Sequence, residues 1–145
     1  MKIEKFSMKH YPEIVQLWKK AGISVGSSDS SDQIEVMLNR NPNLFLIGKL
    51  ENHIVSVVMG GFDGRRGYVH HLAVDPEFQN RGFGKNLIEE LINEFRKLGV
   101  HKIHLFIESA NEKVVQFYLN LGWEIRDDLI MMSFIPDKNL YKMRI

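Results

Sequence analysis

A turn containing two glycines joins an apolar strand to a long amphipathic helix, and this junction constrains the fold more than any other sequence feature. The apolar run from Tyr68 to Val74 is typical of a strand, and Asp75-Pro76 ends it. Apolar residues then recur at helical spacing from Leu87 to Leu98, before a stop at Gly99. The stretch from Ile103 to Ile107 resembles another strand. A strand, a helix and a strand in succession predict a parallel pair.

Further strands and helices are expected on both sides of this unit. Ile3 to Phe6 predicts a short strand, and a helix with Pro12 in its first turn follows and ends at Gly22. Apolar runs and Asp-Gly turn chemistry from Leu44 to Val74 predict an antiparallel meander of three strands. Apolar residues from Trp123 to Ile135 predict two more strands. The expected order is β-α-α-β-β-β-α-β-α-β-β in one mixed sheet.

A polar segment, Gly26 to Asp32, separates the first two predicted helices. Its serines and aspartates are too polar to predict burial, and Ser31 or Asp32 is the expected start of a short helix over Ile34 to Leu38. The segment is either a mobile surface loop or a flap that contacts substrate.

Composition limits the classes of function. The 145 residues predict one domain, 1–145, and 44% hydrophobic with 26% charged residues is typical of a globular protein. With 19 basic and 18 acidic residues, the chain lacks the excess of positive charge that favours nucleic acid or membrane surfaces. We therefore expect no nucleic-acid partner.

The absence of cysteine excludes disulfides, thiolate metal sites and a cysteine nucleophile. Charged residues interrupt the N-terminus where a signal peptide would be apolar, and no apolar run approaches the ~20 residues that span a bilayer. These features predict a cytoplasmic protein with no membrane partner.

The glycine turn can hold a phosphate, because glycine permits close backbone approach and the amides at a helix N-terminus attract anions. Two common nucleotide motifs do not fit. A dinucleotide fingerprint starting at Gly82 would need glycine in place of Leu87, and a Walker A loop ending at Lys85 would need glycine in place of Gln79.

The segment Gln79-Asn80-Arg81-Gly82-Phe83-Gly84 instead resembles motif A, Gln/Arg-x-x-Gly-x-Gly/Ala, of the GNAT superfamily of acyl-CoA-dependent N-acyltransferases. Asn111, Phe117-Tyr118 and Leu121-Gly122-Trp123 resemble its motif B, with Trp where Phe or Tyr is commoner. The resemblance implies an α/β fold, mixed α+β in character. Its central, mostly antiparallel sheet would have about six to seven strands with a splayed parallel pair, flanked by about four helices.

The resemblance further implies acetyl-CoA as cosubstrate, with no metal. The pyrophosphate would lie on the turn, and the pantetheine arm would pair with strand backbone and contact Asn111. Tyr118 matches the usual proton donor to the departing sulfur and would also contact the arm. The implied cofactor-binding residues are Leu72, Ala73, Val74, Gln79, Asn80, Arg81, Gly82, Phe83, Gly84, Lys85, Asn111 and Tyr118.

The general base is less clearly indicated, because family members often carry a carboxylate where this strand has Tyr-Val-His-His. Strict alternation predicts that His70 and His71 face opposite sides, with His70 on the face of Tyr68 and Leu72. A two-histidine metal site is therefore not expected. His70 and Glu108, at the end of the parallel strand, are the candidate bases, each with a purely structural role as the alternative.

The leading hypothesis is an N-acetyltransferase that moves an acetyl group from acetyl-CoA to a primary amine in a ternary complex. Its partner would be an amine-bearing small molecule, a protein N-terminus or a lysine, and a homodimer stays open. The alternatives are a noncatalytic acyl-CoA sensor on the same fold, or a binding domain for a small molecule or protein without CoA.

Overall fold

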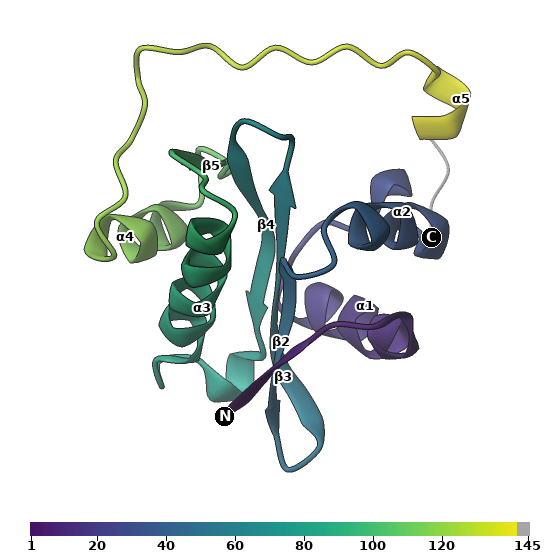
Figure 1. Ribbon diagram of the computed structural model, residues 1–145, viewed down its shortest axis with the longest axis vertical. Helices are drawn as coiled ribbons and strands as arrows, with labels where there is room; N and C mark the ends of the chain where they lie inside the picture. Colours follow the sequence, from purple (N-terminus) through teal and green to yellow (C-terminus); the bar gives the residue numbers. More distant parts are fainter. Residues whose placement is uncertain (142–145) are drawn as a thin grey trace.

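A computed structural model describes residues 1–141, in which five strands form one sheet with helices on both faces (Figure 1). The strands are β1 (Lys2–Lys5), β2 (Phe45–Leu50), β3 (His53–Phe62), β4 (Gly67–Val74) and β5 (Ile103–Leu105). The helices are α1 (Tyr11–Lys20), α2 (Ser31–Arg40), α3 (Phe83–Lys97), α4 (Glu112–Asn120) and α5 (Lys138–Tyr141). Short 3-10 turns are η1 (Met8–His10), η2 (Ser27–Asp29) and η3 (Pro76–Phe78).

The strands lie in sequence order, and only the last pair is parallel. β4 pairs with β5 from Gly67 opposite Ile103 to Val69 opposite Leu105, which confirms the predicted parallel pair. β4 then continues to Val74 beside β3 alone. The parallel strands therefore separate along the second half of β4, as expected for a splayed pair.

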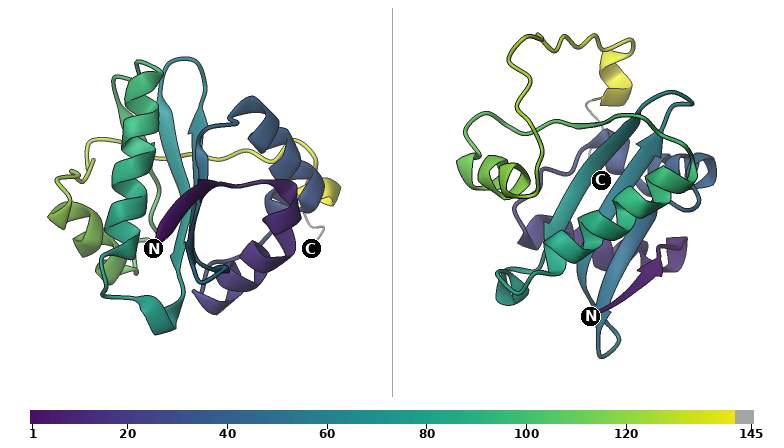
Figure 2. Two further views of the ribbon diagram at one scale, coloured as in Figure 1. Left: turned by 60° about the horizontal axis from the view of Figure 1, so that its bottom comes forward. Right: turned by 60° about the vertical axis from the view of Figure 1, so that its left-hand side comes forward.

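A hydrophobic core lies on each face of the sheet, because helices cover both faces (Figure 2). One core packs Trp18 and other residues of α1, with Ile34 of α2, against Ile47 and Val57. The other joins Leu87, Ile88, Leu91 and Phe95 of α3, and Tyr118 of α4, to the opposite face. Burial on both sides explains why β2 and β3 are nearly continuous apolar runs rather than alternating ones.

Local sequence signals locate the helix ends. Pro12 lies in the first turn of α1, as predicted, and Ser30 caps α2 by accepting a hydrogen bond from the Gln33 amide. α2 therefore begins at Ser31, one of the two predicted starts, and it continues to Arg40, two residues beyond the predicted Leu38. Gly99 follows α3 with φ of +73°, in the left-handed region. No helix described within residues 1–141 is both long and apolar enough to cross a membrane.

The two strands predicted over Trp123 to Ile135 are wrong for the described chain. After α4 the chain runs extended over one end of the molecule to α5, without pairing to the sheet (Figure 1). Its apolar side chains face outward, and Ile130 and Met132 are each 90% exposed. An apolar segment forms a strand only where a neighbouring strand supplies hydrogen bonds, and the outer edge of the short β5 stays unpaired here. The sheet accordingly has fewer strands than the six to seven expected.

Adjacent glycines in β3 give a test of core packing. A Cβ at Gly60 would lie 2.8 Å from Leu91 Cδ1 and 3.0 Å from the Leu44 carbonyl oxygen, which belongs to backbone. Gly60→Ala should lower the free energy of unfolding by about 1–3 kcal/mol through overpacking. In the matched control Gly61→Ala, the Cβ would lie 3.3 Å from the flexible end of Met37 and 3.9 Å from His70 Nε2, and the change should cost less than about 1 kcal/mol. Urea unfolding measures both, and equal losses would contradict this packing.

Candidate functional site

The turn between β4 and α3 takes the conformation that the glycine pattern predicts. Asn80 and Gly82 have φ of +63° and +81°, both in the left-handed region. Gly82 is the N-cap of α3, and no side chain of the described residues caps this helix. A Cβ at Gly82 would meet no atom within 4 Å, so backbone conformation rather than space favours glycine. The first amides of α3 are therefore left for an external acceptor.

Side chains around the turn fix its shape and add positive charge. Gln79 Nε2 donates to the Val74 carbonyl at 3.1 Å, which ties the turn back to the end of β4. Arg81 and Lys85 are exposed, and the Arg81 guanidinium lies 5.2 Å from the centroid of the Phe78 ring. An anion at the α3 N-terminus would thus meet backbone amides with two cations nearby.

Gly84 joins the two motifs that lie apart in the sequence. A Cβ there would lie 3.3 Å from Phe117 Cζ on α4 and 3.4 Å from Val74 Cγ2 on β4. Glycine thus permits the start of α3 to approach α4 and the end of β4 closely. The structure brings the predicted turn, the strand end and the helix of motif B together at one place.

Tyr118 lies on α4 on the same side of the sheet as α3, with 6% of its surface exposed. Its ring packs at 5.0 Å from Phe117 and 5.3 Å from Trp123, measured between centroids. Burial raises the pKa of the Tyr118 phenol well above its ordinary value. The hydroxyl therefore stays protonated at neutral pH and can act as a proton donor.

The remaining residues predicted to hold an acyl carrier lie along the splayed strand and at the start of α4. Leu72 packs into the core under α3 and α4, Ala73 packs into the opposite core, and Val74 lies beside Gly84. Ala73 pairs with Val57 of β3, so the other edge of β4 at this point faces the gap left by β5. Asn111 is exposed at the N-cap of α4.

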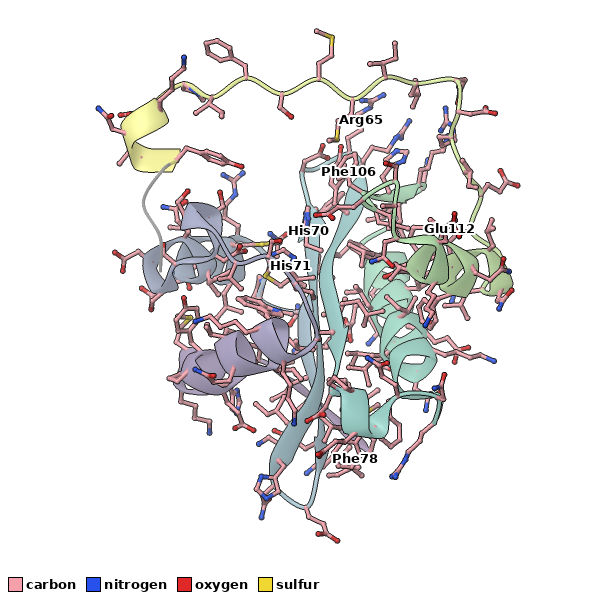
Figure 3. All side chains as sticks on the ribbon, turned by 180° about the vertical axis from the view of Figure 1, so that it is seen from behind. Arg65, His70, His71, Phe78, Phe106 and Glu112 are labelled. Carbon is pink, nitrogen blue, oxygen red and sulfur yellow. The ribbon has the colours of Figure 1, made fainter. Side chains whose placement is uncertain are left out.

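The prediction that His70 and His71 face opposite sides is wrong. Met59 pairs with His70 and Val57 with Ala73, so His71 and Leu72 together oppose Val58 in a β-bulge. His71 has φ of +49°, and this bulge turns its side chain to the same face as His70 (Figure 3). Leu72, predicted to share that face, instead packs on the other side.

Both histidines lie on the face covered by α1 and α2. The centroid of the His71 ring is 5.2 Å from that of the Trp18 ring of α1. His70 lies near Gly61, because a Cβ placed at Gly61 would be 3.9 Å from His70 Nε2 and 3.3 Å from Met37 of α2. Burial, followed by the nearby charge of His71, lowers the pKa of His70 below its ordinary value. Although the bulge removes the reason given against a paired-histidine site, no group of three or more metal-ligating side chains occurs within residues 1–141.

Asp29 is the polar residue of this face that sequence reasoning misplaced. The segment containing it was expected to be exposed, yet Asp29 is only 8% exposed, and its Oδ1 lies 2.8 Å from His71 Nε2. Its Oδ2 accepts from the Gly26 amide at 3.0 Å. Burial would raise the pKa of Asp29, but the hydrogen bonds from His71 and Gly26 outweigh it and lower that pKa. No local sequence signal links this carboxylate to a strand 42 residues away.

Glu108, the other candidate base, lies beyond the end of β5 rather than at it. Its side chain is exposed, and its carbonyl oxygen accepts from the Asn111 amide at 2.8 Å in the turn before α4. The position is close in sequence to the motif B asparagine. Its carboxylate is solvated rather than held in the splay.

A hollow of about 880 Å³ borders the turn on the side of α1. Arg81 and Phe78 line one wall, and Lys20 bonds Asp75 across it at 2.9 Å. Burial would raise the pKa of Asp75, but the hydrogen bond from Lys20 lowers it overall. This hollow is separate from Tyr118, which lies on the α4 side of the turn.

Comparisons with known proteins agree on one family. The family model described as "Acetyltransferase (GNAT) family" matches residues 11–123. Acetyltransferase SG1711 of Sodalis glossinidius is 31% identical over 133 residues, which cover 92% of this chain and 94% of the relative.

Two solved structures share the fold with a TM-score of 0.79. Ard1 from Thermoplasma volcanium is 18% identical and covers 86% of this chain and 83% of its own. The PaiA N-acetyltransferase from Thermoplasma acidophilum, in complex with coenzyme A, is 17% identical and covers 87% and 91%. With the family model matching most of its length, this chain belongs to the acetyltransferase (GNAT) family.

Proposed function

We propose that the protein transfers an acetyl group from acetyl-CoA to a primary amine by direct attack within a ternary complex. The observation that carries this proposal is the start of α3, which has glycine at its N-cap and no side-chain cap among the described residues. At Gly84 this start of α3 packs closely against α4, the helix that contains Tyr118. Family membership and the coenzyme A complex of a structural neighbour support it.

The α3 N-terminus would hold the pyrophosphate through the amides from Arg81 to Lys85, with the side chains of Arg81 and Lys85 adding charge. The turn fits this role because its amides meet no side-chain cap in the described chain and Gly82 leaves open space beside them. Backbone from Leu72 to Val74 would pair with the amide-like arm along the splay, with Asn111 on the other side.

Acetyl-CoA supplies an acetyl group activated as a thioester. Tyr118 would donate a proton to the departing sulfur. Its phenol is protonated at neutral pH, as an unperturbed tyrosine also is, and burial favours that neutral form further. The amine would approach from the α1 and α2 face, because α3, α4 and the turn occupy the other face. The chain has no cysteine, which removes the commonest acyl-enzyme nucleophile and favours direct attack of the amine on the thioester.

Calorimetric titration with acetyl-CoA, followed by thiol release over a panel of polyamines, amino acids, aminoglycosides and peptides with free N-termini, tests the proposal. We expect binding, and turnover with at least one amine. Binding without turnover would instead support a noncatalytic acyl-CoA sensor. The absence of binding would contradict the proposed cosubstrate.

Gly82→Asp should weaken acetyl-CoA binding about tenfold or more, because a carboxylate would repel pyrophosphate at the helix N-terminus. Gly99→Asp is the matched control, since Gly99 also has positive φ and open space but lies at the other end of α3. Both variants should lose about 1 kcal/mol of stability from backbone strain. Only the first should change the dissociation constant measured by calorimetry, and equal effects would contradict the assigned role.

Tyr118→Phe should lower kcat by about 10²-fold, the lower part of the range for general acid catalysis, with little change in acetyl-CoA affinity. The exposed Tyr141 is the matched control, and Tyr141→Phe should leave both constants as they are. Steady-state kinetics and calorimetry separate the two effects. Loss of affinity with normal kcat in Tyr118→Phe would assign Tyr118 to binding instead.

A further inference from the structure

The β-bulge in β4 places a histidine in a strained conformation beside the splay. His71 has φ of +49°, in a region that non-glycine residues rarely occupy, and the interruption follows soon after Val69, the last residue of β4 to pair with β5. Such strain persists only where the surroundings over-determine it, and it concentrates at functional sites. The bulge therefore aims the imidazole toward the α1 and α2 face at the point where the two parallel strands separate.

The carboxylate that meets this imidazole is itself fixed. Asp29 Oδ1 lies 2.8 Å from His71 Nε2, while Asp29 Oδ2 accepts from the Gly26 amide. The carbonyl oxygen of Asp29 accepts from Tyr11 Oη at 2.7 Å, which ties η2 to α1. The Trp18 ring packs edge-on against the imidazole. Two helical elements thus hold the pair, and 27% of the His71 side chain remains accessible.

We propose that His71 accepts the proton of the substrate ammonium, and that Asp29 is the positioning residue that sets its ring. This inference rests on the proposed function and names the base that acts in that site. The N–H bond of the ammonium breaks, its proton moves to the imidazole, and the electron pair stays on nitrogen for attack on the acetyl carbonyl. The imidazolium later returns the proton to water.

The hydrogen bond to Asp29 determines which ring nitrogen acts. An ionised carboxylate accepts hydrogen bonds only, so Nε2 must carry hydrogen, and Nδ1 keeps the lone pair in the neutral ring. Protonation at Nδ1 then gives an imidazolium that Asp29 stabilises at 2.8 Å. The lowered pKa of Asp29 keeps this carboxylate ionised at neutral pH.

His70 is the neighbouring alternative, and its surroundings favour it less. A base must carry positive charge after the transfer, and both the burial of His70 and its proximity to His71 disfavour that state. The titratable groups around His71 are Asp29 of η2, which it contacts directly, and His70 of the same strand. Tyr11 of α1 lies next to this pair, because its hydroxyl donates to the Asp29 carbonyl. Burial, with the charge of Asp29, raises the pKa of Tyr11, so this phenol stays neutral.

The ring proton can be located without any substrate. Nitrogen-15 NMR of the full chain should show the neutral His71 ring with hydrogen on Nε2. Asp29→Asn should shift it toward a mixture of tautomers, because an amide can either donate or accept. Glu35→Gln, a matched change at an exposed position on α2, should leave the ring unchanged. Hydrogen on Nδ1 in the unmodified protein would overturn the inference.

The pH dependence of kcat tests the role itself, using the panel amine that turns over fastest. His71→Gln should lower kcat about 10²-fold and remove the acid limb, while leaving acetyl-CoA affinity unchanged. Asp29→Asn should lower kcat about tenfold, because an amide can donate or accept and no longer fixes the ring with its lone pair on Nδ1. A purely structural role for His71 would leave the acid limb in place.

Controls separate this inference from the proposed function. His101→Gln, at an exposed histidine, and Glu35→Gln should both reproduce the unmodified profile. If His70→Gln removes the acid limb and His71→Gln does not, His71 is not the proton acceptor. Thiol release from no amine would contradict the proposed function. Normal turnover in both His71→Gln and Asp29→Asn, with the acid limb retained in His71→Gln, would contradict the inference alone. Melting temperatures close to that of the unmodified protein confirm folding.

Discussion

The end of hydrogen bonding between β4 and β5 is the constraint on which the rest of the site depends. The ladder closes at Val69 and Leu105, and past it β4 is held on one edge only. Backbone groups on the free edge and the glycine turn at the strand's end then lie on one continuous path. α4 packs beside the end of this path, because Gly84 lets Phe117 approach the start of α3.

Each face of the sheet takes a different part of the proposed chemistry. The face under α3 and α4 has the uncapped helix start and a buried phenol, which suit an anionic acyl carrier and proton donation to sulfur. The face under α1 and α2 has two histidines and a buried carboxylate, which suit proton removal from an amine. The bulge changes which side chains of β4 point to which face of the sheet. Val69 packs into the core under α3 and α4, whereas Ala73, four residues later, packs into the opposite core.

Much of the fold followed from the order of local signals. The meander, the Pro12 start of α1 and the glycines of motif A were predictable from signals within short segments. The parallel pair was predictable from the order of a strand, a helix and a strand. The last two strands were not, because an apolar run such as Leu129 to Met132 does not show whether a partner strand is within reach. Asp29 was placed in an exposed loop, because its partner on β4 is distant in sequence.

By itself the sequence determined the family, the phosphate-type turn and the tyrosine of motif B, since these depend on residue type at fixed short spacing. Only the tertiary structure decided which side chains meet across the sheet. Strict alternation would have separated His70 from His71, and a single extra residue in the bulge put them on one face with Asp29 beside His71. The physical reason is that a strand's hydrogen-bond register is set by its neighbour, so the direction of each side chain is a property of the pair of strands.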